Sequence, residues 1–239
     1  MKYLLFLDFD GTLTPIVKRP SLAKLSANHK NILKKLSQQP DITLAIISGR
    51  QLTDLKNKVG LTNIYYAGNH GLEIFGPKIR LTHPRASAAK PLLSKIKKEL
   101  KQKLDKIPGV LVEDKILTLS IHYRLVKPSS LKKFKRALRE TLAPDLKAKK
   151  IKLTEGKKVF EVRPNVPWDK GKTVLWFMKK LGRHKTPVYI GDDSTDEDAF
   201  RALSKKGITI RVGPSKGSVA QKFLKDVNQV FHFLKTMLR

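Results

Sequence analysis

A short apolar segment near the amino terminus, Tyr3 to Leu7, ends directly in two acidic residues, Asp8 and Asp10. Both of its faces are apolar, which predicts a strand buried within a parallel sheet. The segment is too short for a signal peptide or a membrane-spanning helix. Because ligands bind at the carboxyl ends of the strands in open α/β sheets, the sequence predicts a functional site at Asp8 and Asp10.

Further apolar runs alternate with helical patterns. We expect other core strands at residues 42–47, 64–67 and 188–190, and core helices at residues 27–38, 52–59, 170–181 and 195–203. This alternation is typical of an α/β fold, a Rossmann-like parallel sheet with helices on both faces. Polar groups follow three of the strands, so they should converge at one edge of the sheet.

The middle of the chain has a different pattern. Helices are expected at residues 88–104 and 130–142, and strands at residues 110–113, 117–123, 151–154 and 158–162. The pattern predicts a small α+β cap domain, residues 84–163, inserted into a core of residues 1–83 and 164–239. The crossings near residues 77–84 and 163–167 are short enough to act as hinges.

The inserted domain holds 23 Lys and Arg against 8 Asp and Glu, half of the formal net charge of +30. Such a field can hold nucleic acid or an anionic membrane, and it can speed the capture of an anionic substrate. The lysines fall on helical faces without interleaved aromatic residues for stacking. We therefore expect a solvated surface with no membrane or nucleic-acid partner, and keep nucleic-acid binding as the remote alternative.

The chain contains no cysteine. This excludes disulfides, thiolate metal sites and a cysteine nucleophile, and it suits a reducing compartment. We expect a cytoplasmic monomer.

The segment Asp8-Phe9-Asp10-Gly11-Thr12 places two carboxylates on the same side of an extended chain, and Gly11 allows a sharp turn after them. Two such carboxylates repel each other unless a divalent cation binds them or one stays protonated. One can attack phosphorus, while the other donates a proton to the leaving oxygen and later takes one from water. The pair therefore suits phosphoryl transfer.

A second acidic cluster, Gly191-Asp192-Asp193-Ser194-Thr195-Asp196-Glu197, follows another apolar strand. One acidic turn would be ordinary, but two at equivalent sheet positions indicate a cation with oxygen ligands. Mg²⁺ is favoured because it takes few carboxylates and keeps water and substrate phosphate in its shell. Glu197 is also typical of the first turn of a helix.

Two further residues offer phosphate donors. Ser48 follows the strand at residues 42–47, and its hydroxyl and nearby N–H groups could bind a phosphoryl oxygen, although serine is also common as a helix cap. Lys170 opens a helix and could neutralise charge on the transferred phosphoryl group. Only its position relative to the acidic clusters separates it from the many surface lysines.

These motifs together resemble the haloacid dehalogenase superfamily of phosphatases. The resemblance rests on D-x-D-G-T at Asp8 to Thr12, Ser48, Lys170 and G-D-D-x-x-D at Gly191 to Asp196. Within that superfamily the chain is similar to the trehalose-6-phosphate phosphatases, over nearly its whole length. The shared segments are Ser48-Gly49-Arg50, Asn69-His70-Gly71, Val112-Glu113-Asp114-Lys115, His122-Tyr123-Arg124, Gly156-Lys157 and Glu161-Val162-Arg163-Pro164.

The resemblance implies that the cap closes over the substrate, that Asp8 is the nucleophile and that Asp10 is the general acid and base. It implies a Mg²⁺ site formed by Asp8, Asp192 and the backbone carbonyl of Asp10. Asp193 is included in the metal set, and it or Asp196 would support the metal or Lys170. Gly11, Thr12 and Gly49 would support the site.

The resemblance also implies a substrate-binding set of Arg50, Asn69, His70, Glu113, Lys115, Arg124, Lys157 and Glu161. Carboxylates accept hydrogen bonds from sugar hydroxyls while Lys and Arg donate to them, so a polyol pocket needs both. Without the resemblance, we would interpret the Glu113–Lys115 and Lys157–Glu161 segments as ordinary solvated strands. His70 is expected to position groups rather than transfer protons. Lys172 competes with Lys170, and Lys158 with Lys157, for the assigned roles.

The expected activity is hydrolysis of trehalose 6-phosphate to trehalose and phosphate through an aspartyl-phosphate intermediate, in trehalose biosynthesis. A phosphatase for sucrose phosphate or mannosyl-3-phosphoglycerate is the alternative within the same chemistry. No accompanying synthase domain is expected.

Overall fold

The computed structural model describes residues 1–182, 184–214 and 216–238, and it divides into two compact units. The core unit comprises Met1–Leu81 and Trp168–Arg239, and the cap unit comprises Thr82–Pro167. The domain boundaries expected from the sequence lie between residues 83 and 84 and between residues 163 and 164, within the crossings at residues 77–84 and 163–167. Among the described residues, no helix has both the length and the hydropathy needed to cross a bilayer.

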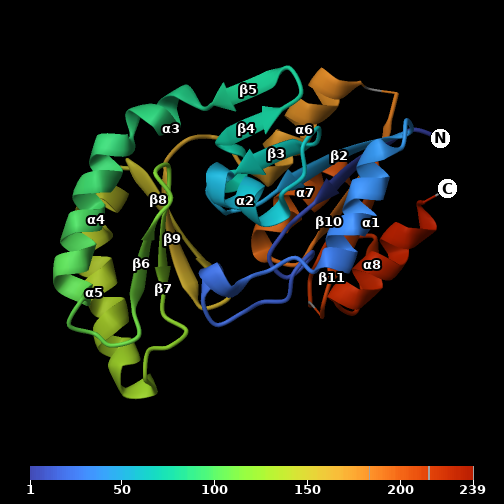
Figure 1. The fold of residues 1–239 in the computed structure, drawn as a ribbon. Helices are drawn as coiled ribbons and strands as arrows, with labels where there is room; N and C mark the ends of the chain where they lie inside the picture. Colours follow the sequence, from blue (N-terminus) through green and yellow to red (C-terminus); the bar gives the residue numbers. More distant parts are fainter. Residues whose placement is uncertain (183, 215, 239) are drawn as a thin grey trace. The chain divides into compact units, whose positions relative to one another are not determined.

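The sheet of the core has eight strands within the described residues (Figure 1). In spatial order they are β12 (Lys222–Leu224), β11 (Ile208–Val212), β10 (Thr186–Gly191), β1 (Tyr3–Leu7), β2 (Ile42–Ile47), β3 (Tyr65–Gly68), β4 (Glu73–Gly76) and β5 (Ile79–Thr82). Pairing is parallel from β12 to β3 and antiparallel between β3 and β4. As predicted, β1 is a buried strand of the parallel sheet, and its neighbours are β2 and β10.

Helices cover both faces of this sheet because successive side chains of a strand point to opposite faces. Leu5 and Leu7 of β1 belong to a hydrophobic cluster shared with α1 (Ala27–Gln38), α2 (Leu52–Val59) and α8 (Val227–Thr236). Leu4 and Phe6 belong to a second cluster, shared with α6 (Lys170–Leu181) and α7 (Glu197–Leu203). The predicted α/β core with helices on both faces is confirmed.

The cap unit packs two helices against one antiparallel sheet. Its helices are α4 (Lys90–Leu104) and α5 (Pro128–Lys147), preceded by the short α3 (Pro84–Ala88), and the spatial order of its strands is β6 (Leu111–Asp114), β7 (Leu119–His122), β9 (Val159–Pro164) and β8 (Ile151–Gly156). Leu119, Ile121, Phe160 and Val162 share one hydrophobic cluster with the two helices. The alternate residues of these strands therefore lie on the opposite face of the sheet.

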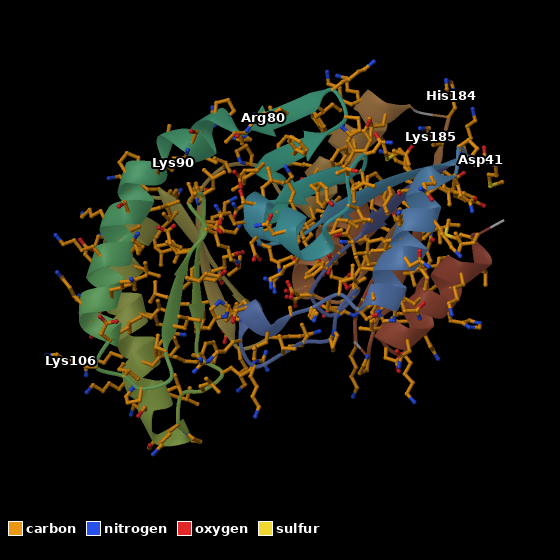
Figure 2. All side chains as sticks on the ribbon, in the orientation of Figure 1. Asp41, Arg80, Lys90, Lys106, His184 and Lys185 are labelled. Carbon is orange, nitrogen blue, oxygen red and sulfur yellow. The ribbon has the colours of Figure 1, made fainter. Side chains whose placement is uncertain are left out.

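Basic side chains cover the helical layer of the cap. Lys90 lies at the start of α4 and Lys106 just beyond its end (Figure 2), and both are exposed. Two of its acidic residues, Glu99 and Glu140, pair with Lys95 and Arg136 one turn earlier on the same helix. The positive charge read from the sequence thus lies largely on a solvated helical surface.

Several element boundaries differ from the sequence prediction for identifiable reasons. The helix expected at residues 88–104 is interrupted at Ala89, and α4 restarts there with Pro91 in its first turn, where proline is well tolerated. The helix expected at residues 195–203 begins instead as a 3₁₀ turn, Ser194–Asp196, closed by a capping box. The short strands β4, β5, β11 and β12 and the helix α8 were not predicted.

Candidate active site

Three predicted site segments meet at the carboxyl edge of the core sheet. Asp8 follows β1, Ser48 follows β2 and Asp192 follows β10, and β1 pairs directly with both other strands. The parallel register aligns Leu7 with Ile46 and with Ile190, so the three strands end close together. Residues far apart in the sequence are therefore brought to one place, as the sequence argument expected.

A buried lysine holds the Asp8 carboxylate. The Lys170 Nζ donates to Asp8 Oδ1 at 2.8 Å and to Asp196 Oδ1 at 2.7 Å, and the Lys170 and Asp8 side chains are only 3% and 6% exposed. Lys170 occupies the first position of α6, where Asp169 caps the helix by accepting from the backbone N–H of Lys172. Lys172 itself is exposed, so the geometry favours Lys170 over Lys172.

Burial of Asp8 and Lys170 away from water shifts the pKa values of both side chains. Burial raises the pKa of Asp8 well above its usual range; the charge of Lys170 opposes that rise, and the carboxylates of Asp196 and Asp192 add to it. Although burial acts against its charge, the pKa of Lys170 is raised by Asp196 and Asp8. A divalent cation beside Asp8 would favour its ionised form.

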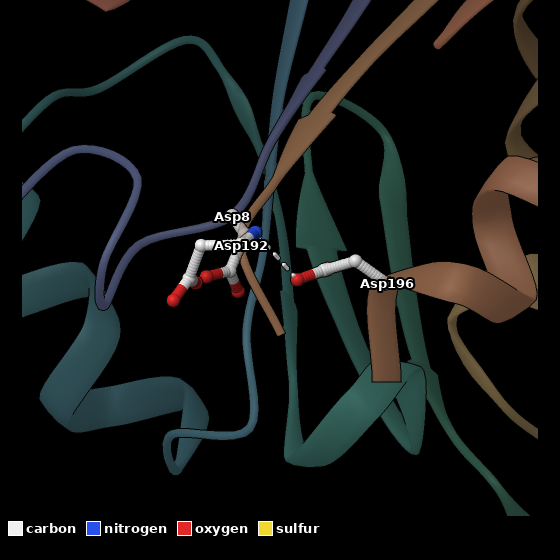
Figure 3. A group of neighbouring side chains, drawn as sticks. All are labelled: Asp8, Asp192 and Asp196. Carbon is white, nitrogen blue, oxygen red and sulfur yellow. Dashed lines mark hydrogen bonds between the residues drawn. The ribbon is translucent and has the colours of Figure 1, made fainter. Parts of the chain in front are cut away.

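Among the described residues, a group of three buried carboxylates, Asp8, Asp192 and Asp196, has ligand atoms within 4.8 Å of one another (Figure 3). Asp196 is already engaged, because Lys170 and the Tyr189 hydroxyl donate to its Oδ1. Its other oxygen accepts from the backbone N–H groups of Asp192 and Asp193. Asp196 therefore shapes the acidic loop, and Asp8 and Asp192 are the better candidates for a cation.

Asp193 caps the turn that follows β10. Its side chain accepts from the backbone N–H of Ser194 at 2.7 Å and forms the capping box with Asp196. The described carboxylates that come together as a possible cation site include Asp196 and not Asp193. The order of the acidic residues alone could not separate these roles, because both follow the same strand.

Gly11 is required by a close approach. Its φ of +90° is unfavourable for other residues, and a Cβ at this position would lie 2.1 Å from Asp192 Oδ2. Thr12 next to it is fully buried. The turn after Asp10 thus lets the Asp192 carboxylate pack directly on the backbone that carries Asp8 and Asp10.

The Ser48 and Asn69 segments are joined by backbone hydrogen bonds. The N–H of His70 donates to the Ser48 carbonyl at 2.9 Å, and that of Asn69 donates to the Arg50 carbonyl at 2.7 Å. A Cβ on Gly49 would lie 2.8 Å from the His70 ring. Ser48 Oγ accepts from the backbone N–H of Arg50 at 3.2 Å. These predicted residues form one structure, whose positive φ at Asn69 and His70 marks a tight turn.

The Arg50 guanidinium donates hydrogen bonds to both carboxylate oxygens of Asp10. Its Nε donates to Asp10 Oδ2 at 2.7 Å and its Nη2 donates to Asp10 Oδ1 at 2.8 Å. Its Nη1 donates to Asp54 Oδ2 at 2.6 Å. The two carboxylates of the first motif therefore have different cationic partners, a lysine for Asp8 and an arginine for Asp10.

Two of the cap residues predicted to bind sugar, Glu113 and Glu161, lie on one face of the cap sheet, and Lys115 contacts Glu161. The strand register places Glu113, Ser120, Glu161 and Thr154 in one row across β6, β7, β9 and β8, on the face opposite the helices. Lys115 Nζ lies 3.2 Å from Glu161 Oε1, and His122 Nε2 lies 2.7 Å from Glu113 Oε2. The face carries acceptors and donors in pairs.

Arg124, Lys157 and Lys158 gather near the turn between β8 and β9. Arg124 Nη2 donates to the Lys157 carbonyl at 2.5 Å. The Lys158 Nζ lies 5.9 Å from the centre of the Tyr123 ring, and the Lys158 carbonyl accepts from the backbone N–H of Tyr123. Lys157 therefore contacts Arg124 through its backbone, whereas the Lys158 side chain lies over the Tyr123 ring.

Sequence reasoning missed a buried arginine behind the acidic loop. The Nη2 of Arg211 donates to the Asp192 carbonyl at 2.8 Å, and its Nη1 donates to Glu197 Oε1 at 2.7 Å. Glu197 also accepts from the backbone N–H of Val219 at 3.0 Å. Arg211 and Glu197 therefore anchor the loop that carries Asp192. A lone arginine inside the apolar strand Ile208–Val212 was the available signal.

Comparison with known proteins places this arrangement in a family. The family model described as trehalose-phosphatase matches residues 6–229, which include every carboxylate described above. The chain belongs to the trehalose-phosphatase family. This confirms the resemblance read from the motifs, and it covers both the core and the cap unit of this family member.

Relatives of this trehalose-phosphatase family member are found in plants and bacteria. The chain is 38% identical over 245 residues to the probable trehalose-phosphate phosphatase 4 of Oryza sativa subsp. japonica, covering 98% of this chain and 65% of the relative. It is 40% identical over 212 residues to the trehalose-phosphate phosphatase of Mycobacterium tuberculosis (strain H37Rv), covering 87% and 53%. The chain thus spans about half to two thirds of the length of these relatives.

Solved structures agree in fold. The C-terminal domain of the C. albicans trehalose-6-phosphate phosphatase superposes with a TM-score of 0.86 at 28% identity, covering 99% of this chain and 92% of that one. A trehalose-6-phosphate phosphatase related protein superposes with a TM-score of 0.84 at 22% identity, covering 98% and 96%. The second likeness supports the fold alone.

Proposed function

We propose that the chain hydrolyses trehalose 6-phosphate to trehalose and phosphate in trehalose biosynthesis. The observation that carries the proposal is the family match across residues 6–229, which contains Asp8 in contact with the buried Lys170. Such a pair suits a carboxylate nucleophile, since the ammonium can neutralise charge on a phosphoryl group beside it.

In the first half-reaction an oxygen of Asp8 attacks phosphorus, and the bond between phosphorus and the sugar oxygen breaks. Asp10 donates its proton to that leaving oxygen, so trehalose departs neutral and Asp8 carries the phosphoryl group. In the second half-reaction Asp10 takes a proton from water, whose oxygen attacks phosphorus and releases phosphate and the Asp8 carboxylate. Lys170 and Ser48 hold phosphoryl oxygens throughout.

The donor set fits Mg²⁺. Asp8 and Asp192 supply carboxylate oxygens within a buried acidic group, which is the ligand chemistry that hard divalent cations prefer. The absence of a side chain on Gly11 leaves room for the Asp192 carboxylate at the turn. When bound, Mg²⁺ would neutralise phosphoryl charge and favour ionised Asp8. Asp8, Asp192 and the Asp10 carbonyl would hold it, while Asp196, Asp193 and Arg211 shape the loop.

The polar face of the cap sheet supplies the sugar contacts in this proposal. Glu113 and Glu161 can accept from trehalose hydroxyls, and Lys115, Arg124 and Lys157 can donate to sugar oxygens. Asn69 and His70, held against the Ser48 segment, would position the phosphate end of the substrate. We further propose that the chain acts as a cytoplasmic monomer, which sedimentation of the purified protein and cell fractionation can test.

The experiment is a comparison of phosphate release from trehalose 6-phosphate, sucrose 6-phosphate and mannosyl-3-phosphoglycerate, each with Mg²⁺ and with a chelator. The highest kcat/KM is expected for trehalose 6-phosphate, with loss of activity in chelator, because specificity is a difference in transition-state binding. A higher kcat/KM for either other substrate would reassign the substrate while keeping the chemistry. Full activity in chelator would remove the metal from the proposal.

A further inference from the structure

Arg50 makes more protein contacts than a substrate-binding arginine needs. All three guanidinium nitrogens donate to protein acceptors: Nε and Nη2 to the two oxygens of Asp10, Nη1 to Asp54, and Nη2 also to the Pro20 carbonyl at 2.9 Å. The side chain is 6% exposed, and its guanidinium carbon lies 5.3 Å from the centre of the Phe9 ring. The arginine is thus fixed by its surroundings.

Asp10 is held by Arg50, and its side chain is more exposed than that of Asp8. Its side chain is 34% exposed, whereas the Asp8 side chain is 6% exposed. It lies three residues beyond the end of β1, in an isolated bridge with Thr14, so the main sheet does not restrain its side chain. A bidentate contact to a rigid guanidinium fixes both the position and the plane of a carboxylate.

We propose that Arg50 is a positioning residue that aims the Asp10 carboxyl group at the leaving oxygen, rather than a ligand of the substrate. The inference rests on the proposed phosphatase function. As the phosphorus–oxygen bond breaks and the Asp8–phosphorus bond forms, the Asp10 proton passes to the ester oxygen. The carboxylate that remains is the form that accepts both Arg50 hydrogen bonds. Asp54 and the Pro20 carbonyl keep Arg50 in place for this exchange.

The test separates proton donation from binding by varying the leaving group alone. Phenyl phosphate and 4-nitrophenyl phosphate have similar shapes, but 4-nitrophenolate leaves readily without a proton and phenolate does not. General acid catalysis contributes about 100-fold to 10,000-fold where it is needed. In the Arg50→Gln variant we expect kcat/KM for phenyl phosphate to fall by about 100-fold, and for 4-nitrophenyl phosphate by less than about 5-fold.

Two further variants isolate the contact. Arg50→Lys keeps the positive charge but cannot donate to both Asp10 oxygens at once. We therefore expect a smaller fall in kcat/KM than for Arg50→Gln, again larger for phenyl phosphate than for 4-nitrophenyl phosphate. In a protein that already carries Asp10→Asn, adding Arg50→Gln should not lower kcat/KM further for either aryl phosphate. The reason is that the effects of two mutations do not add when the residues act through each other. Arg201→Gln removes a surface arginine paired with Asp198 and serves as the control with unchanged rates.

Equal losses on both aryl phosphates, or no loss, would overturn the inference, since either result means that Arg50 does not act through proton donation. If Arg50→Gln does not fold, Asp54→Asn replaces it, with a smaller loss expected on phenyl phosphate alone. Wild-type hydrolysis of aryl phosphates without hydrolysis of trehalose 6-phosphate would reject the proposed substrate and leave the Arg50 test intact. A wild-type protein inactive on every phosphate ester would reject both.

Discussion

The core and cap units both pair acidic with basic side chains, but they do so in different settings. In the core, Lys170 is buried between Asp8 and Asp196, and Arg50 is fastened to Asp10 and Asp54. In the cap, Glu113 and Glu161 lie in one row across the sheet, and they contact His122 and Lys115 respectively. The core arrangement favours fixed chemistry, in which each charge depends on its partner. In the proposed function, the paired donors and acceptors of the cap face would exchange hydrogen bonds with sugar hydroxyls.

The largest expected effect comes from replacing Asp8, the proposed nucleophile in the core unit. Asp8→Asn should lower kcat on every phosphate ester by about 10,000-fold or more, since no covalent intermediate can form. Steady-state phosphate release measures this, and Asp198→Asn, an acidic residue on the core surface, is the control. Retention of full activity would show that Asp8 is not the nucleophile.

A lysine in each unit can be removed to compare what its charge does for stability. Lys170→Met leaves two buried carboxylates uncompensated and should lower the free energy of unfolding by about 3–5 kcal/mol. Lys115→Met removes one contact of a single carboxylate, Glu161, and should lower the free energy of unfolding by less. Urea unfolding followed by circular dichroism provides both values. Equal losses would mean that the cap pair is as structural as the core pair.

Cation binding should involve the core carboxylates and leave the cap unaffected. Excess Mg²⁺ should raise the thermal midpoint of the wild-type protein, by a stabilisation of about 2.7 kcal/mol at one hundred times the dissociation constant. Asp192→Asn should abolish this shift, because one of the ligands is lost, while the cap variant Glu99→Gln should keep it. A Mg²⁺-induced shift that survives Asp192→Asn would place the cation elsewhere.

The cap face should affect one substrate and not another. Glu161→Gln weakens acceptance from sugar hydroxyls and should lower kcat/KM for trehalose 6-phosphate by about 10-fold to 100-fold. The rate on 4-nitrophenyl phosphate should stay the same, because that ester presents no sugar hydroxyls. The exposed Glu99→Gln is again the control. Equal losses on both substrates would assign Glu161 to the chemistry and remove the contrast between the units.

The smallest expected effect concerns acid stability of the cap. Burial acts to raise the pKa of Asp114, but hydrogen bonds from Lys97 and the Ile116 N–H outweigh it, so this pKa lies below its usual value of 3.8. A folded-state pKa below the unfolded one gives stability that is present above pH 3.8 and lost as the pH falls through the lowered pKa.

Asp114→Asn should therefore destabilise the protein at pH 7 by less than about 1 kcal/mol, as expected for a partly exposed pair. The difference should shrink as the pH falls below 3.8, and urea unfolding at several pH values measures it. Asp105→Asn, at the end of α4, is the control. A difference that stays constant with pH would mean that the carboxylate charge is not responsible.

Much of the fold could be predicted because the patterns were strong. The strands at residues 3–7 and 42–47 were predicted correctly, since uninterrupted apolar runs with turn residues after them fit only a buried parallel strand. The strand β12 and the helix α8 were missed. The first has three residues, largely exposed, and gives too little periodicity. The second carried a usable signal that was overlooked, because Asp226 caps the helix and the apolar residues Val230, Phe231 and Leu234 follow at helical spacing.

The residue types at the ends of the core strands, and with them the family, could be read from the order of the amino acids. That order could not assign partners. That Lys170 rather than Lys172 reaches Asp8, that Asp196 lies with Asp8 where Asp193 caps a turn, and that Arg50 belongs to Asp10 were decided by the tertiary structure. The physical reason is that burial and hydrogen-bond geometry, rather than spacing along the chain, determine which charges meet.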